Sequence, residues 1–206
     1  SLSKEMFDIS FGMDIAYRKN AGLNPDFTAS LTRGFGDPSL TPADFSPDPD
    51  DYPGATGDIW GVVINGVGFL NAEWGLWDGG SWIVEYTTSW LDKFKKNEQY
   101  ADVDMHKGRV TTQIAAVFKP TWYQVFPGWD LSVPITVSYS IDGEQPPQGS
   151  VLEEELGNAS VGISFLVDEV WIADVKYSAY FGPSYPGTTG PLNDRDNVSF
   201  TVKRTF

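Results

Sequence analysis

Cysteine is absent from the 206-residue chain, and histidine occurs once, as His106. The lack of cysteine excludes a disulfide scaffold, a thiolate metal site and a cysteine nucleophile. A single histidine excludes a metal centre built from several imidazole ligands. No run approaches the roughly 18 consecutive apolar residues that a membrane-spanning helix needs. These absences leave folds and functions that need neither sulfur chemistry nor helical spans.

Basic residues are also scarce, since 14 Lys and Arg stand against 28 Asp and Glu, for a net charge of −14. This balance argues against nucleic acid as a partner, because phosphate backbones bind positively charged surfaces. Hydrophobic residues nevertheless make up 41% of the chain and aromatic residues 15%. Such a chain is too apolar to be a disordered acidic protein.

What the sequence does contain is a strict alternation of apolar and polar residues. From Phe7 to Arg18, six large apolar residues alternate with Asp, Ser, Gly, Asp, Ala and Arg. A period of two fits a β-strand with one apolar and one polar face, and it fits no helix. The pattern recurs and predicts eight strands, which begin near residues 7, 58, 82, 110, 131, 159, 171 and 197.

The predicted connections alternate between long and short. Residues 19–57, 92–109, 142–156 and 182–196 form the long connections, and residues 72–80, 120–130 and 168–169 form the short ones. Transmembrane β-barrels show this asymmetry, with short turns on one side and long loops on the other. The alternative is a soluble β-sandwich or lipocalin-like barrel, in which the apolar face is buried inside.

Three features favour the membrane barrel. Large apolar side chains on eight strands would overfill a small soluble barrel, and most aromatic residues lie near strand ends, where interfacial girdles form. The chain ends on an alternating strand that resembles the assembly signal of bacterial outer-membrane proteins, with Val198, Phe200, Val202 and Phe206. We therefore predict an all-β fold over residues 1–206, an antiparallel transmembrane β-barrel of eight strands or the C-terminal part of a larger barrel.

Several sequence blocks resemble one family. They are Gly57–Trp60 with Val63–Gly66, Leu91–Lys93 with Lys96–Glu98, Tyr123–Pro134, Asp174–Tyr177 with Tyr180–Gly182, and Asp194–Phe200. In order and spacing, these blocks are similar to the C-terminal portion of the proteobacterial outer-membrane family called "domain of unknown function 1302", over most of residues 57–206. The resemblance implies a longer parent protein with a signal peptide, and partners that resemble lipoprotein carriers and proton-driven lipid exporters. It implies no catalytic residues.

The polar positions of the strands are the first candidate site, because they would face the lumen of a barrel. These candidates are Asp8, Asp14, Arg18, Glu85, Gln113, Lys119, Asp174, Lys176 and Lys203. Mixed charges of this kind either line a water-filled path or form a salt-bridged plug in a narrow barrel. Eight strands favour the plug, and a larger barrel favours the channel.

The second candidate is an acidic stretch among prolines, with Asp44, Asp48, Asp50, Asp51 and Asp58. Asp48, Asp50 and Asp51 are the candidates for a hard cation such as Ca²⁺. Their spacing does not match an EF-hand loop, and a solvated acidic loop is the favoured interpretation. We expect neither a metal nor a cofactor.

These observations predict a channel or transporter for hydrophobic or small molecules in the bacterial outer membrane. The alternative is a structural or surface-interaction barrel whose long extracellular loops bind partners. The expected partners are outer-membrane lipid and lipopolysaccharide, together with the barrel-assembly machinery. An enzyme is not expected, because the single histidine lies in a Lys- and Asp-rich loop and leaves little to act as a general base.

Overall fold

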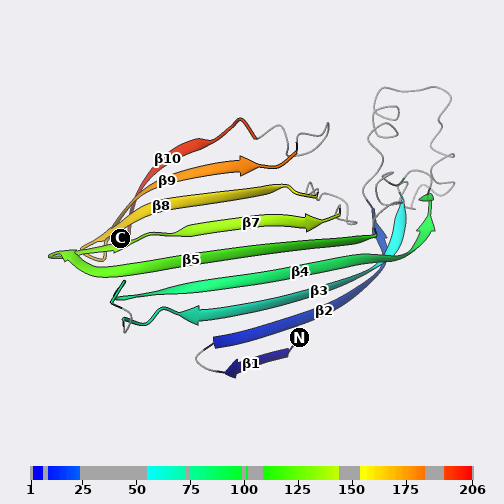
Figure 1. Cartoon of the computed structure of the whole chain (residues 1–206), viewed down its shortest axis with the longest axis horizontal. Coiled ribbons are helices and arrows are strands. Elements are labelled where there is room, and N and C mark those ends of the chain that lie inside the picture. Colours follow the sequence, from blue (N-terminus) through cyan, green and yellow to red (C-terminus); the bar gives the residue numbers. More distant parts are fainter. Residues whose placement is uncertain are drawn as a thin grey trace.

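The computed structural model describes residues 2–6, 9–23, 55–72, 75–98, 101, 109–143, 154–183 and 193–205. In this part of the chain it contains ten strands in one antiparallel sheet (Figure 1). They are β1 (Leu2–Met6), β2 (Ile9–Gly22), β3 (Thr56–Phe69), β4 (Gly79–Lys96), β5 (Val110–Phe126), β6 (Trp129–Ser132), β7 (Ile135–Asp142), β8 (Gly157–Val167), β9 (Trp171–Phe181) and β10 (Asn197–Arg204). No helix in the described ranges is long and apolar enough to cross a membrane.

The sheet confirms the predicted all-β antiparallel fold, but the predicted count of eight strands is wrong. An additional strand, β1, precedes the first predicted strand and pairs with the beginning of β2. The strand predicted from residue 131 to 141 is two strands, because Pro134 has no N–H to donate to the ladder. At this break the Val133 N–H donates to the Pro120 carbonyl at 3.0 Å, and the Pro134 carbonyl accepts from Gly162 N–H at 2.9 Å. Both β6 and β7 therefore remain between β5 and β8.

All long connections leave and re-enter the sheet at the same end, on the right in Figure 1, here called the loop end. The short connections over residues 70–78, 127–128 and 168–170 lie at the opposite end, here called the turn end. At the last of these, Asp168 and Glu169 have φ angles of 50° and 58°, and Val170 N–H donates to the Val167 carbonyl at 3.0 Å. Two consecutive positive φ angles are typical of the type I′ turn, whose twist matches that of the flanking strands.

The strand register gives the sheet one apolar and one polar face. One row runs across five strands as Met13, Ile64, Tyr86, Ile114 and Tyr139, each paired with the next. Directly paired residues point to the same side of a sheet, so this row defines the apolar face. Strand pairing places further apolar side chains on the same face, namely Phe11, Ile15, Val62, Val84, Ala116, Val137, Val161, Val175 and Phe200. The residues that alternate with them form the polar face.

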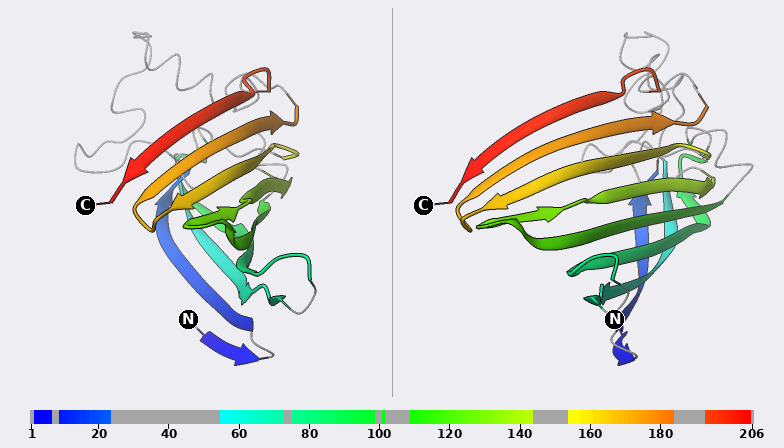
Figure 2. Two further views of the ribbon diagram at one scale, coloured as in Figure 1. Left: turned by 90° about the vertical axis from the view of Figure 1, so that its left-hand side faces the viewer. Right: turned by 60° about the vertical axis from the view of Figure 1, so that its left-hand side comes forward.

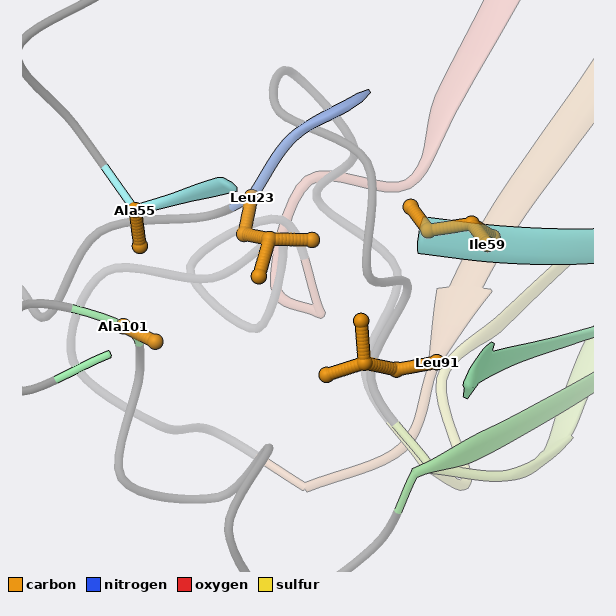
Figure 3. Packing of buried hydrophobic residues seen from close by; sticks show 5 residues of the cluster. All are labelled: Leu23, Ala55, Ile59, Leu91 and Ala101. Atoms are coloured by element: carbon orange, nitrogen blue, oxygen red, sulfur yellow. The ribbon is translucent and has the colours of Figure 1, made fainter. Parts of the chain in front are cut away.

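The described strands form a single layer, and each makes its extensive contacts with its neighbours in the sheet. The hydrophobic core is correspondingly small. Its main cluster lies at the loop end of β2–β4, where Leu23, Ala55, Ile59, Leu91 and Ala101 converge (Figure 3). On the apolar face, by contrast, side chains remain exposed over the whole width of the sheet.

The sheet curves into an open trough (Figure 2). Its two edges are β1 and β10, which do not pair with each other within the described residues. Both edge strands run from the loop end to the turn end, because β1 is antiparallel to β2 and β10 is antiparallel to β9. Antiparallel pairing between these two strands is therefore impossible while both keep their direction.

Two glycines of the sheet differ in whether they accept a side chain. Gly80 has a φ of 136° and its missing Cβ would fall against the Lys119 carbonyl, whereas nothing lies within 4 Å of a Cβ built on Gly61. We expect Gly80→Ala to destabilise the protein by about 1–3 kcal/mol, and Gly61→Ala to change stability by less than about 0.5 kcal/mol. Urea unfolding monitored by tryptophan fluorescence checks both, and equal midpoints for the two variants would contradict the described start of β4.

Candidate functional site

The polar face carries eight of the nine lumen candidates, and Asp8 lies outside the described residues. The eight are Asp14, Arg18, Glu85, Gln113, Lys119, Asp174, Lys176 and Lys203. Asp14 and Gln113 share one row, through Val63 and Thr87 of the strands between them. Glu85 belongs to the adjacent row, in which it pairs with Ala115 of β5.

The structure separates these candidates into two groups. Arg18, Asp14, Glu85, Gln113 and Lys119 lie on β2, β4 and β5, whereas Asp174, Lys176 and Lys203 lie on β9 and β10. The strands between them present small hydroxyl side chains on the same face. Thr136 and Ser160 are hydrogen-bonded there at 2.7 Å, and Thr121 and Ser132 at 3.0 Å. The polar face is therefore a charged surface divided by a band of Ser and Thr.

A second charged site lies at the loop end and centres on Asp58. Its side chain is only 1% exposed, although the sequence placed this residue in a solvated acidic loop; that expectation is wrong. The Tyr17 hydroxyl donates to Oδ2 at 3.0 Å and the Asn20 N–H donates to Oδ1 at 3.1 Å. Lys95 Nζ lies 3.2 Å from Oδ2 and Lys93 Nζ 3.6 Å from it.

The position of Asp58 follows from irregular pairing of the surrounding strands. The β2–β3 register shifts between Arg18 and Ala21, and the β3–β4 register shifts on both sides of Asp58. These bulges bend the strand ends and bring two lysines of β4 onto one carboxylate. Burial by itself raises the pKa of Asp58, but the donated hydrogen bonds and Lys95 outweigh it and lower the pKa to about 2.

Aromatic rings continue from this site along the apolar face. The Tyr17 and Trp60 ring centroids are 4.6 Å apart, and Trp60 stacks on Trp90 with centroids 5.9 Å apart and an interplanar angle of 15°. These three rings come from β2, β3 and β4, in positions that pair directly. Further along the same end, Tyr139 and Phe181 stack at 6.1 Å. We call these five rings the loop-end aromatic row.

A second set of rings lies at the turn end. Trp129 packs edge-on against Phe165 at 5.6 Å, and the Arg204 guanidinium lies over Trp171 at 5.1 Å from the ring centroid. Trp82 and Phe118 pair with each other on the same face. These rings, Trp82, Phe118, Trp129, Phe165 and Trp171, form the turn-end aromatic row.

The carboxylate arrangement at Asp58 occurs a second time, at the other side of the sheet. The Tyr177 hydroxyl donates to Asp196 Oδ2, and the Tyr180 N–H donates to Asp196 Oδ1 at 3.2 Å. In both places the donating N–H belongs to the third residue after the tyrosine. The aspartate lies two residues before the residue that pairs with the tyrosine on the neighbouring strand. Each carboxylate thus ties two strands together where a long connection leaves the sheet. Sequence reasoning missed both clamps, because they depend on strand register.

The remaining candidates from the sequence are the assembly signal at the C-terminal strand and the acidic stretch among prolines. Val198, Phe200 and Val202 lie on the apolar face of β10, while Phe206 is outside the described residues. Asp48, Asp50 and Asp51 also lie outside them. In the part of the chain that is described, no group of three or more His, Asp or Glu is placed to hold a metal ion.

A family model described as "Protein of unknown function (DUF1302)" matches residues 1–206, which extends the resemblance beyond residues 57–206 to the whole chain. No curated protein and no solved structure matches the chain.

Replacing Asp58 tests the buried charged site. We expect Asp58→Asn to lower the thermal midpoint of unfolding, because it removes the anion that Lys93 and Lys95 share. Asp92→Asn is the matched control, since it deletes the same charge from an exposed residue of the neighbouring strand β4. Thermal melts of the two variants provide the comparison, and equal midpoints would show that the Asp58 contacts contribute nothing specific.

Proposed function

Since the chain belongs to the DUF1302 family of proteins of unknown function, we propose its role from its geometry. It is an outer-membrane β-barrel protein that acts as a channel or transporter for hydrophobic or small molecules. The observation that supports this proposal most strongly is the apolar face, which no other layer covers in the described part of the chain. It extends from strand to strand across the sheet and lies between the two aromatic rows.

The exposure of the apolar face argues for lipid as its solvent. Ile64 is 44% exposed, Val175 47% and Phe200 71%, and these residues lie on strands at opposite sides of the sheet. Soluble proteins rarely expose contiguous apolar patches larger than a few hundred Å². Within a bilayer such a face is stable, provided that backbone groups are paired in a sheet.

The spacing of the aromatic rows fits the height of a hydrocarbon layer. Trp82 and Trp90 are eight residues apart on β4, and Trp171 and Phe181 are ten residues apart on β9. At the usual rise these separations are about 26 and 33 Å along the strand, or roughly 20–25 Å after a strand tilt of about 40°. Membrane barrels carry an apolar band about 25 Å tall between aromatic girdles. The proposed membrane span lies between the two rows, and Asp58 lies beyond it on the loop side.

Closure of the barrel requires the free edges to find partners, because unpaired backbone groups are costly in lipid. β1 and β10 run in the same direction, so they cannot close an all-antiparallel barrel together. Closure requires either that β2, instead of β1, pairs with β10, or that an odd number of further strands lies between β1 and β10. The apolar alternation of β10 also suits it to recognition by the barrel-assembly machinery.

The polar face supports transport. In a closed barrel it would line the interior, and its charged groups with the intervening Ser and Thr would offer a hydrated path. A structural or surface-interaction barrel is the second candidate, and the two carboxylate clamps favour it because they fix the strand ends from which long connections leave. Lipoprotein-carrier-like and exporter-like partners are part of the proposal for the transport role.

Adjacent residues of β3 distinguish a lipid-facing from a water-facing surface. Ile64 lies on the apolar face and Asn65 on the polar face. We expect Ile64→Arg to destabilise the protein in bilayers by about 2–4 kcal/mol, with a much smaller effect of Asn65→Arg. The measurement is urea unfolding of both variants reconstituted in phosphatidylcholine vesicles. Equal, small effects would indicate that both faces meet water.

Planar bilayers test the channel directly. We expect the protein to give stepwise conductance, and Asp14→Asn and Lys176→Gln to shift its ion selectivity in opposite directions because they remove opposite charges from the polar face. Lys93→Gln is a control outside the proposed lumen. A membrane that stays silent at all voltages would contradict the channel and leave the surface-interaction role.

A further inference from the structure

Among the described residues, positive charge gathers at the loop-end ends of β2, β3 and β4. Residues 18–23, 55–58, 91–98, 101 and 109 contain six cationic and three acidic residues, a net charge of +3. The cationic residues are Arg18, Lys19, Lys93, Lys95, Lys96 and Arg109. We call this part of the sheet the basic margin. The whole chain, by comparison, carries a net charge of −14.

The basic margin directly continues the loop-end aromatic row. Along β4 the order is apolar residues, then Trp90, then Lys93 and Lys95. Along β2 the apolar residues are likewise followed by Tyr17 and then Lys19. The contact between the two zones is continuous, because Tyr17 touches both the Trp60 ring and the Asp58 carboxylate that the lysines share.

Asp58 holds two of these lysines in place without neutralising them. One carboxylate lies 3.2 Å from Lys95 Nζ and 3.6 Å from Lys93 Nζ, and it also accepts from Tyr17 and Asn20. Each ammonium group has three N–H donors, and the lysine side chains remain 37% and 54% exposed. Both therefore keep donors for a second anion on the solvent side.

The other side of the loop end has the opposite sign. Residues 139–143, 154–157, 179–183 and 193–197 contain five acidic residues and one cationic residue, a net charge of −4. An anionic ligand at the membrane surface would be attracted to the basic margin and repelled from this side. The charge asymmetry therefore assigns the ligand to β2–β4.

We propose that the basic margin binds the phosphate groups of a phosphorylated lipid in the leaflet on the loop side. The acyl chains of the lipid would lie against the apolar face below the Tyr17–Trp60–Trp90 rings, and its phosphates would accept hydrogen bonds from Lys19, Lys93 and Lys96. This inference rests on the proposed membrane location and adds to it a ligand class and a site.

The test uses the full chain reconstituted in phosphatidylcholine nanodiscs and titrated with lipid A or with dephosphorylated lipid A. Native mass spectrometry of the released complexes gives the affinities. Each lysine near a membrane surface contributes a factor of about five to binding of anionic lipid. We expect lipid A to bind more tightly than its dephosphorylated form, and Lys19→Gln/Lys93→Gln/Lys96→Gln to remove most of that difference. Lys95 is retained in this variant so that Asp58 keeps a partner.

The matched control is Lys119→Gln/Lys176→Gln/Lys203→Gln, which removes the same charge from the polar face and is expected to bind lipid A like the unmodified protein. Equal binding of both lipids, or equal loss in both triple variants, would overturn the proposed site. If the basic-margin variant does not fold, the comparison of the two lipids on the unmodified protein still decides. Failure of the unmodified protein to insert into bilayers would instead contradict the proposed function.

Discussion

The structure depends on how a single β-layer accommodates its apolar face. Strand pairing satisfies the backbone inside the sheet, and the register carries the apolar side chains of every strand to the same side. No second layer packs against that side within the described residues. The proposed membrane location would make lipid the solvent of this side, because exposed apolar side chains need no protein cover there. The long strands, the aromatic rows and the small core at the loop end are consistent with this one constraint.

At the loop end, side chains hold together the strand ends from which the long connections leave. Two aspartates do so in the same way, each accepting one tyrosine hydroxyl and one backbone N–H. Such clamps give the strand ends a defined geometry at a place where the ladder is irregular. The first clamp also gathers two lysines, and the second lies in acidic surroundings. Among the described residues, the strand ends at the loop end therefore have a basic side and an acidic side.

Period-two alternation is a local property, which is why the strands and their faces could be predicted from sequence. β1 was missed because Ser3, Lys4 and Glu5 interrupt the alternation of its five residues. The break at Pro134 was missed because apolar residues keep alternating through it, although the missing N–H was visible in the sequence. The burial of Asp58 could not be predicted, since it results from register shifts on both of its neighbouring strands. The family resemblance was confirmed, whereas the roles of the polar-face residues stay predictions.

The most direct measurement of the proposed lipid-facing surface uses the absence of cysteine from the chain. Single cysteines introduced at successive positions from 172 to 180 of β9 each give a unique spin label, because the chain has no other thiol. In bilayers, labels on the apolar face, such as at Val175 and Tyr177, should collide with oxygen dissolved in the lipid. Labels on the polar face, such as at Asp174 and Lys176, should collide with a water-soluble nickel chelate. Alternation of the two accessibilities with a period of two is the expected result. Uniform access of the nickel chelate to both faces would contradict a membrane location for this sheet.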